Sequence, residues 1–238
     1  RPGGQRRMSS AVAARSPFEP GTPRPRFIAH AAGNSEAAAL AAIPDGPDFL
    51  EVDIWTHNDH LEARHERAAY PFPLWFEKWY FKLAPRQPFS LAQLLATLRS
   101  RAAVMLDMKN GTERAAQMLR ASIERAPGAT IAASSQSWNS LRWIAHYCPG
   151  VDLFYSIDVL PKLDLFLSVL ERDYRPRGVS CRHTLLDSEV VAGLHDRGML
   201  VIAWTVDDIE RARDLVAMGV DGLTTHRVAD FREAFGTP

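Results

Sequence analysis

From Arg26 onward, short apolar runs alternate with longer segments in which apolar residues recur every three or four positions. A short apolar run is typical of a buried strand, whereas the longer spacing is typical of one face of a helix. The predicted strands are 27–30, 49–55, 103–109, 130–135, 151–157, 178–181, 200–206 and 222–225. The predicted helices are 35–43, 90–99, 112–125, 138–147, 161–171, 187–196, 208–218 and 228–235.

This alternation of strand and helix predicts an α/β fold in one domain. Successive βα units favour a parallel sheet with right-handed crossovers, and eight of them favour a closed TIM-type (β/α)8 barrel over an open sheet. The barrel is expected to span residues 26–238. Residues 1–25 are rich in Pro, Gly, Ser and Arg without periodicity, and are predicted to form a flexible N-terminal tail. No glycine-rich fingerprint follows the first strand, which argues against dinucleotide binding.

One stretch interrupts the alternation after the second strand. Residues 61–65 suggest a short extended return, and residues 66–89 form an insertion rich in aromatic residues and proline. Most of the aromatic side chains lie from Tyr70 to Phe81. This segment is interpreted as a loop packed over the barrel, as a lid, or as a peripheral membrane contact. Contact with a membrane would favour lipid substrates over soluble ones.

Composition and charge narrow the function classes. With 46% hydrophobic residues the chain can bury a substantial core, and its 28 basic and 28 acidic residues give no basic footprint for nucleic acid. Cys148 and Cys181 form no CxxC pair and are expected to be small buried thiols, which fits a reducing compartment. No apolar run approaches the roughly 18 residues of a membrane span, and no signal peptide is visible. A cytoplasmic location is therefore expected, and a processed secreted form stays open.

Polar side chains that could act in catalysis or bind a metal lie at the ends of the first three predicted strands. His30 ends the first strand, and Glu51 and Asp53 lie two apart in the second, so that they share one face. Asp107 and Lys109 end the third strand with the same spacing. A barrel keeps its active site at these strand ends, and clustered carboxylates suit a hard divalent cation. An exposed strand face and a structural ion pair are the plainer interpretations of the two pairs.

Other polar and aromatic residues allow two interpretations each. His65 lies on the return after the second strand, close to the same strand ends, and Trp204 is either a wall of the substrate mouth or part of the core. Asn34 is expected to cap the first helix rather than to shape the metal site. The remaining histidines are expected to be structural or solvated; they are His57, His60, His146, His183, His195 and His226.

A series of short motifs appears in order along the successive strands. They are Ile28-Ala-His30, Glu51-Val-Asp53, His65-Glu66, Asp107-Met-Lys109, Ser137-Trp138, Trp204-Thr-Val-Asp207 and Gly219-Val-Asp-Gly222. Together they resemble the glycerophosphodiester phosphodiesterase family, within the phospholipase C-like superfamily of barrels. The resemblance covers nearly the whole chain from Arg26 onward.

The resemblance implies roles for the residues of the motifs. His30 and His65 would be the acid and base pair, and one divalent cation, Mg²⁺ or Ca²⁺, would be held by an acidic set that consists of Glu51, Asp53 and Asp107. Lys109 and Trp204 would bind the substrate. A cation beside the phosphate would neutralise the charge that builds up during attack. Two histidines can take up and release protons near neutral pH.

The sequence also departs from the family pattern. Ala31 follows His30 where the family usually has an arginine that helps to bind phosphate. Glu66, Asp107 and His226 stand where the family usually has aspartate, glutamate and aspartate. The aspartate before x-Lys, and the first histidine without its arginine, resemble the related phospholipase D toxins of spider venoms.

The sequence thus predicts metal-dependent hydrolysis of glycerophosphodiesters, as part of lipid metabolism. The expected partner is a small-molecule or lysolipid phosphodiester such as glycerophosphocholine or a lysophospholipid. One alternative is a phospholipase D-like enzyme that releases head groups with formation of a cyclic phosphate. Another is a non-catalytic barrel that binds phosphate-bearing ligands. The oligomeric state is not indicated.

Overall fold

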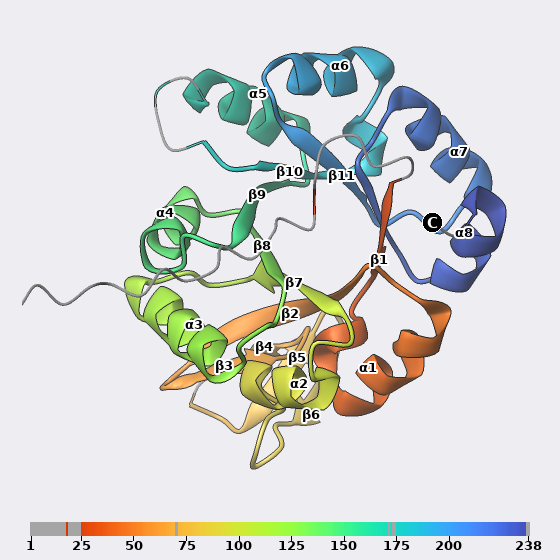
Figure 1. Cartoon of the computed structure of the whole chain (residues 1–238). Helices are drawn as coiled ribbons and strands as arrows, with labels where there is room; N and C mark the ends of the chain where they lie inside the picture. The colour runs from red at the N-terminus through yellow and green to blue at the C-terminus, as the bar shows by residue number, and fades with distance from the viewer. Residues whose placement is uncertain (1–17, 19–24, 70, 171, 173–174, 237–238) are drawn as a thin grey trace, which may run out of the picture.

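Parallel strands close into a barrel with an outer ring of helices (Figure 1). The computed structural model describes residue 18 and residues 25–69, 71–170, 172 and 175–236. The barrel strands run in the order β1, β2, β7, β8, β9, β10, β11, β12, and β1 pairs with both β2 and β12, which closes the ring. The predicted TIM-type barrel is therefore confirmed.

The observed elements follow the predicted ones within a few residues. The barrel strands are β1 Arg26–Ala29, β2 Phe49–His57, β7 Ala103–Met108, β8 Ile131–Ser135, β9 Asp152–Ile157, β10 Gly178–Arg182, β11 Leu200–Trp204 and β12 Gly222–Thr225. The helices are α1 Glu36–Ala42, α2 Leu91–Leu98, α3 Glu113–Arg125, α4 Trp138–Tyr147, α5 Leu160–Val169, α6 Ser188–Asp196, α7 Ile209–Met218 and α8 Val228–Phe235. Short 3-10 turns lie at Ala32–Asn34, Ile43–Asp45 and His183–Leu185.

Polar side chains fix where most of the helices begin. Ser90, before α2, accepts a hydrogen bond from the amide of Gln93, and the side-chain oxygen of Gln93 accepts one from the Ser90 amide, which completes a capping box. Comparable caps precede other helices, at Ser35, Thr112, Ser137, Asp187 and Asp208. Each such cap stabilises a helix by about 1 kcal/mol. The expectation that Asn34 caps the first helix is wrong, because Ser35 does so.

Apolar residues pack in two places, between the barrel and its helices and inside the barrel. Along β2, Phe49 faces the interior and its neighbour Leu50 faces the helices. Phe18 packs inside the barrel as well, with its ring 4.8 Å from that of Phe49 and 5.0 Å from that of Phe154. Apart from Phe18 and Pro25, the predicted tail of residues 1–25 lies outside the described residues.

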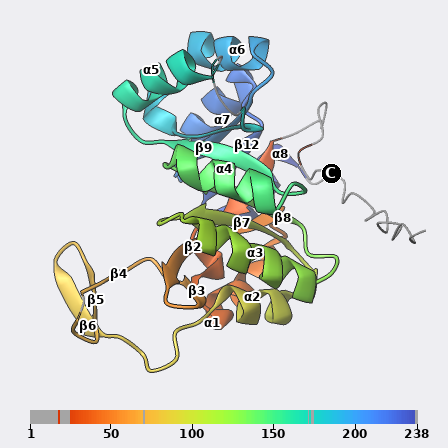
Figure 2. The ribbon, with the colours of Figure 1, turned by 90° about the vertical axis from the view of Figure 1, so that its left-hand side faces the viewer.

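The predicted insertion after the second strand is confirmed and has a fold of its own. The return strand β3, His60–Ala63, pairs antiparallel with the end of β2. Three further strands, β4 Arg67–Ala68, β5 Leu74–Glu77 and β6 Tyr80–Leu83, form a separate antiparallel sheet, which we call the insertion sheet. It projects from the end of the barrel at which β2 ends (Figure 2).

Two expectations from composition can be compared with the described residues. Cys148 and Cys181 are both buried and free, and burial raises the pKa of the Cys148 thiol to about 11 and that of Cys181 to about 12. The expectation of two small buried thiols is confirmed. Within the described ranges, no helix has the length and apolar character needed to cross a bilayer.

Candidate active site

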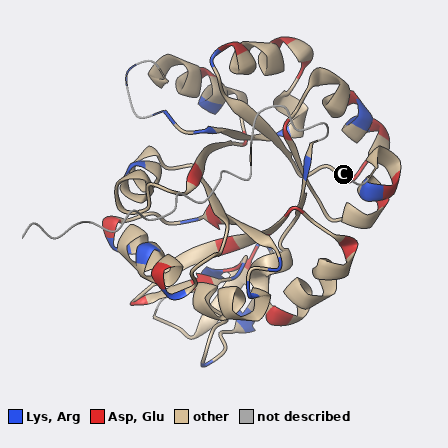
Figure 3. Cartoon of the chain, viewed as in Figure 1, with Lys and Arg blue, Asp and Glu red and all other residues tan. Residues whose placement is uncertain are grey.

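A cavity of about 310 Å³ opens where the barrel strands end. It is lined by every residue that the sequence proposed for the site, namely His30, Glu51, Asp53, His65, Asp107, Lys109 and Trp204. Figure 3 shows acidic residues on several barrel strands around the centre of the ring, and both signs of charge on the outer helices. The strand ends thus bring together residues that lie far apart in the sequence.

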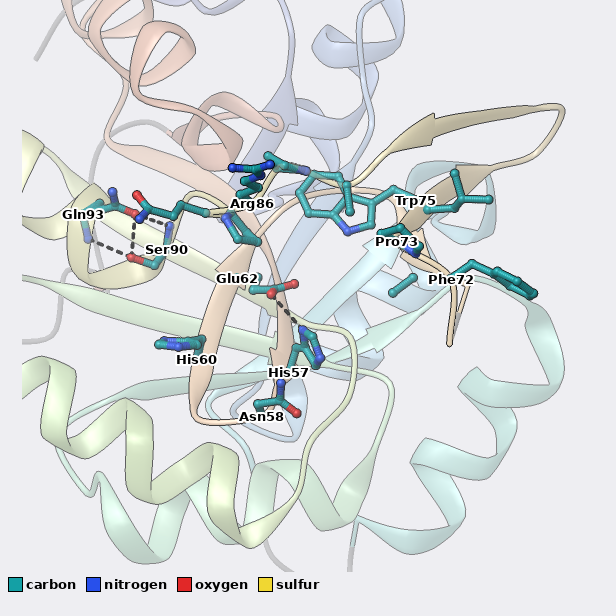
Figure 4. Close-up of a pocket in the computed structure, with 16 residues that line it drawn as sticks. His57, Asn58, His60, Glu62, Phe72, Pro73, Trp75, Arg86, Ser90 and Gln93 are labelled. Atoms are coloured by element: carbon teal, nitrogen blue, oxygen red, sulfur yellow. Dashed lines mark hydrogen bonds and ion pairs between the residues drawn. The ribbon is translucent and has the colours of Figure 1, made fainter.

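A larger cavity, of about 620 Å³, lies between the insertion sheet and the start of α2 (Figure 4). Its lining includes apolar side chains such as Phe72 and Trp75 on one side and His57, His60 and Glu62 on the other. Glu62 is already held by His57 at 3.1 Å and by Arg64 at 2.7 Å. The carboxylates and histidines proposed for chemistry gather in the smaller cavity, which is therefore the candidate active site.

Carboxylates from two adjacent strands form one cluster in the smaller cavity. Alternation along β2 turns Glu51 and Asp53 to the barrel interior, and Asp53 is paired in register with Asp107 of β7. One oxygen from each of Glu51, Asp53 and Asp107 lies within 4.8 Å of the others. Hard divalent cations prefer such clustered oxygen ligands, so the cluster fits a Mg²⁺ or Ca²⁺ ion.

Hydrogen bonds from the first βα turn hold the cluster in place. The amide of Ala31 donates to Glu51 Oε2 at 2.6 Å. The side chain of Asn34 donates to Asp53 Oδ2 at 2.7 Å and accepts from the Asp53 amide at 2.8 Å. Asn34 therefore orients a proposed metal ligand. On the sequence alone, this role was less favoured than capping of the first helix.

Charge in the cluster is only partly balanced by the protein. Lys109 Nζ lies 2.6 Å from Asp53 Oδ1 and also contacts Asp107 Oδ2. Burial alone would lower the pKa of Lys109, but the carboxylates of Asp107 and Asp53 outweigh it and raise that pKa. Burial, and then the charge of Asp53, raise the pKa of Glu51 well above its usual range. Once all three carboxylates are ionised, one ammonium leaves two negative charges, which a divalent cation would neutralise.

His30 lies at the end of a chain of hydrogen-bonded side chains. His30 Nδ1 is 2.8 Å from His226 Nε2, and His226 Nδ1 is 2.8 Å from Asp207 Oδ2. Although burial opposes it, hydrogen bonds from the amide and ring of His226 lower the pKa of Asp207, so this carboxylate is charged and accepts the proton on His226 Nδ1. With that proton on Nδ1, His226 Nε2 accepts from His30 Nδ1, which leaves the lone pair of His30 on Nε2. Burial, and then His226, lower the pKa of His30.

His65 is supported from a different part of the molecule. Its Nδ1 lies 3.1 Å from Glu77 Oε2, on strand β5 of the insertion sheet, and its side chain is 47% exposed. Glu77 also accepts a hydrogen bond from the Tyr80 hydroxyl at 2.9 Å, which is the main cause of its lowered pKa. Glu66, which replaces the usual aspartate, is buried and contacts Lys82 of β6. The second histidine is thus tied to the insertion.

Several residues of the site were not found from the sequence. His226, which was expected to be structural or solvated, is indeed exposed, but it also links His30 to Asp207. Its place after Thr225, where the family usually has aspartate, was the available signal. Trp204 is half-buried and lines the cavity, and small hydroxyl residues on the barrel strands line it too: Ser134, Ser156, Ser180 and Thr224. Single hydroxyls within apolar runs carry no pattern that would reveal them.

Known structures share this fold. The chain matches a phosphodiesterase of Oleispira antarctica in complex with the product sn-glycerol-3-phosphate, with TM-score 0.72, 15% identity and coverage of 89% of this chain and 97% of that one. It matches glycerophosphodiester phosphodiesterases of Thermotoga maritima (TM-score 0.69, 18% identity, 90% and 99% covered) and Parabacteroides distasonis (TM-score 0.70, 19% identity, 90% and 98% covered). At such identities the likeness shows the barrel fold.

A match to a family model gives the class of this barrel, which is a phosphodiesterase. The model of the glycerophosphoryl diester phosphodiesterase family matches residues 105–230, which is more than half of the chain. The chain therefore belongs to the glycerophosphoryl diester phosphodiesterase family, and it is a phosphodiesterase. The matched region contains Asp107, Lys109 and Trp204, whereas the residues on the first two strands lie before it. A search of curated protein sequences found no match.

Proposed function

We propose that this enzyme hydrolyses glycerophosphodiesters, with glycerophosphocholine or a lysophospholipid as substrate, by metal-dependent two-histidine catalysis. The observation that carries the proposal is the cavity in which the oxygens of Glu51, Asp53 and Asp107 lie within 4.8 Å of one another beside His30 and His65. The Oleispira antarctica phosphodiesterase, of the same fold, is described with sn-glycerol-3-phosphate as its product, which supports a glycerol phosphate moiety in the substrate.

The acidic cluster is the proposed metal site. Glu51, Asp53 and Asp107 supply the oxygen donors that Mg²⁺ and Ca²⁺ prefer, and they leave the negative charge that such an ion would balance. When bound, the cation would supply charge neutralisation for the phosphodiester. Asn34 and the Ala31 amide hold two of the carboxylates, so the donors are positioned before any ion arrives.

His30 is the proposed base. The bond to His226 fixes the neutral tautomer with its lone pair on Nε2, and the lowered pKa of His30 keeps the ring unprotonated near neutral pH. His30 would accept the proton of the attacking water or substrate hydroxyl, and His65, held by Glu77, would donate one to the leaving oxygen. Trp204 and Lys109 would hold the substrate, the tryptophan as a wall and the lysine as a positive donor.

A second candidate is head-group release with formation of a cyclic phosphate. Ala31 offers its backbone amide to Glu51 where the family usually places a phosphate-binding arginine, and Asp107 precedes the lysine as in the phospholipase D toxins. Attack by a hydroxyl of the substrate itself needs no bound water and would leave a cyclic product. The non-catalytic alternative is disfavoured, because the chain belongs to a family of phosphodiesterases and keeps both histidines at the cavity.

The test is choline release from glycerophosphocholine and from lysophosphatidylcholine, with Mg²⁺, with Ca²⁺ and with EDTA. We expect release that requires the metal and is lost in His30→Ala. Phosphorus NMR of the products separates glycerol phosphate from a cyclic phosphate and so decides between the two candidates. Release that persists in EDTA, or in His30→Ala, would overturn the proposed mechanism.

A further inference from the structure

The two faces of the insertion sheet differ in polarity. Residues directly opposite in an antiparallel pair share a face, and here Leu74 pairs with Leu83 and Phe76 with Phe81. These side chains form one apolar face, which we call the outer face. Leu83 is 75% exposed and Phe81 69% exposed. Trp79, in the turn between β5 and β6, is 96% exposed.

The opposite face carries buried Trp75 together with Glu77, Tyr80 and Lys82, and it is directed toward the active site. There Glu77 contacts His65 and Tyr80, and Lys82 contacts Glu66. A soluble antiparallel sheet normally turns its apolar face to the core and its polar face to water. The insertion sheet buries Trp75 on its inward face but also exposes apolar Phe81 and Leu83 on the outer face, and an exposed apolar face of this kind marks an interaction surface.

Charge around the outer face favours an anionic lipid surface as the occupant. Arg67 lies opposite Phe76 and therefore shares its face, and exposed Lys78 precedes Trp79 in the turn. Among the described residues of the three strands and this turn, the acidic side chain is Glu77, which points to His65 on the other face. Trp and Phe flanked by Lys and Arg are the composition of segments that lie at a membrane interface, where the rings enter the head-group region.

The position of the sheet matches this occupant. It projects from the mouth end of the barrel, where the candidate active site opens (Figure 2). Strand β5 carries outer-face Phe76 next to Glu77, the residue that supports His65. A surface that binds the sheet is therefore brought next to the cavity, and its position is linked to that of the second histidine.

We propose that the outer face of the insertion sheet docks the enzyme on a lipid–water interface that contains anionic lipids, so that a phosphodiester substrate is taken from an amphiphile in that interface. This inference rests on the proposed function, because it identifies lysophospholipid as the substrate class of the same site. Trp79, Phe81 and Leu83 enter the interface, and Lys78 and Arg67 contact the lipid phosphates.

The test is sedimentation with vesicles of phosphatidylcholine and phosphatidylglycerol, using the whole protein. The variants are Trp79→Ser and the double variant Trp79→Ser/Phe81→Ser. Trp143→Ser is the matched control, because Trp143 is a partly exposed tryptophan on helix α4, outside the insertion. We expect the partition coefficient to fall roughly tenfold for each aromatic ring removed from the sheet, and to stay within about twofold in the control.

A second variant tests the charges independently of the rings. Lys78→Glu should weaken binding to the anionic vesicles several-fold, and should leave the weaker binding to pure phosphatidylcholine unchanged. Circular dichroism and the melting temperature of each variant should equal those of the wild type, because the substituted side chains are exposed.

The outcomes separate docking from catalysis. Vesicle binding is measured without turnover, and hydrolysis of glycerophosphocholine is measured without vesicles and should change less than about twofold in Trp79→Ser. Wild-type protein that stays in the supernatant, or a double variant that still binds vesicles fully, would overturn the docking proposal. So would a wild-type dimer that the double variant converts to monomer, since the face would then bind a second copy. Intact docking without any phosphodiester turnover would overturn the proposed function instead.

Discussion

The two histidines at the cavity are supported by different parts of the molecule. His30 follows β1 and is braced by His226 and Asp207, which lie at the ends of other barrel strands. His65 follows the return strand β3 and is braced by Glu77, which lies on the insertion sheet. His65 is also the more exposed, with 47% of its side chain accessible.

This difference shows how one site can combine a fixed half with an adjustable half. The ends of barrel strands are held on both sides by parallel neighbours, so the position of His30 is a property of the barrel itself. The insertion sheet pairs with no barrel strand in the described part of the chain, so the position of Glu77, which supports the His65 ring, is not fixed by the hydrogen bonds of the barrel. We therefore expect changes near His30 to alter chemistry, and changes near His65 to alter chemistry together with the insertion.

The largest expected effect comes from removing either ring. His30→Ala and His65→Ala should each lower kcat by roughly 10²–10⁴-fold, which is the usual contribution of a general acid or base. The measurement is the initial rate of glycerophosphocholine hydrolysis at saturating metal. If one variant kept wild-type kcat, the two histidines would no longer be partners and the comparison would fail.

Loss of the brace of His30 should have the next largest effect. His226→Ala removes the acceptor that fixes the tautomer of His30, so kcat should fall roughly 10–100-fold with little change in KM. His195→Ala is the matched control, since His195 also pairs with an aspartate, Asp221 at 3.0 Å, but does not line the cavity. Equal rates in the His226 and His195 variants would show that the chain of hydrogen bonds has no function.

Loss of the brace of His65 should cost less, because His65 is already partly solvated. Glu77→Gln should lower kcat about tenfold or less, and the same variant should make the insertion more sensitive to limited proteolysis. Glu210→Gln, which removes an exposed ion pair with Arg213, is the control and should change neither property. A reduction in kcat as large as that of His226→Ala would make the two halves of the site equivalent.

The smallest expected effect concerns the acidic cluster that both histidines face. In the metal-free protein the pKa of Glu51 is raised by burial, so the folded state binds the proton more tightly than the unfolded state. The contribution of Glu51 to the free energy of unfolding is therefore favourable below its pKa in the unfolded state, near 4.5. This contribution is lost as the pH rises toward the pKa of Glu51 in the folded state. In EDTA the melting temperature should fall by about 2–4 °C per pH unit in this window.

Two comparisons sharpen that measurement. Glu51→Gln should reduce the pH dependence, because residue 51 then has no proton to lose and only Asp107, whose pKa is also raised by burial, keeps part of it. Added Mg²⁺ or Ca²⁺ should stabilise the wild type more as the pH rises. A pH profile that is the same in Glu51→Gln and wild type would show that Glu51 is already ionised in the metal-free protein.

Most of the barrel could be predicted from the sequence because its signals are local. Apolar runs, helical spacing and capping residues such as Ser90 and Thr112 act over a few positions, and each marked a boundary that the structure confirms. The insertion was predicted from its aromatic and proline content, but its three-stranded sheet was not. Its strands are short and a turn interrupts them, so polar and apolar residues follow one another without a recognisable strand pattern.

The polar residues that reach the mouth of the barrel follow from the pattern along the chain. Alternation along β2 and β7 places Glu51, Asp53 and Asp107 on the inner face, and the barrel topology carries them to the same end. The residues that support them, in contrast, are set by the folded chain. His30 meets His226 across 196 positions, and Asn34 turns to Asp53 rather than to its own helix. Such partners are selected by closure of the ring and by the packing of an insertion, which involve contacts between distant segments that no local pattern encodes.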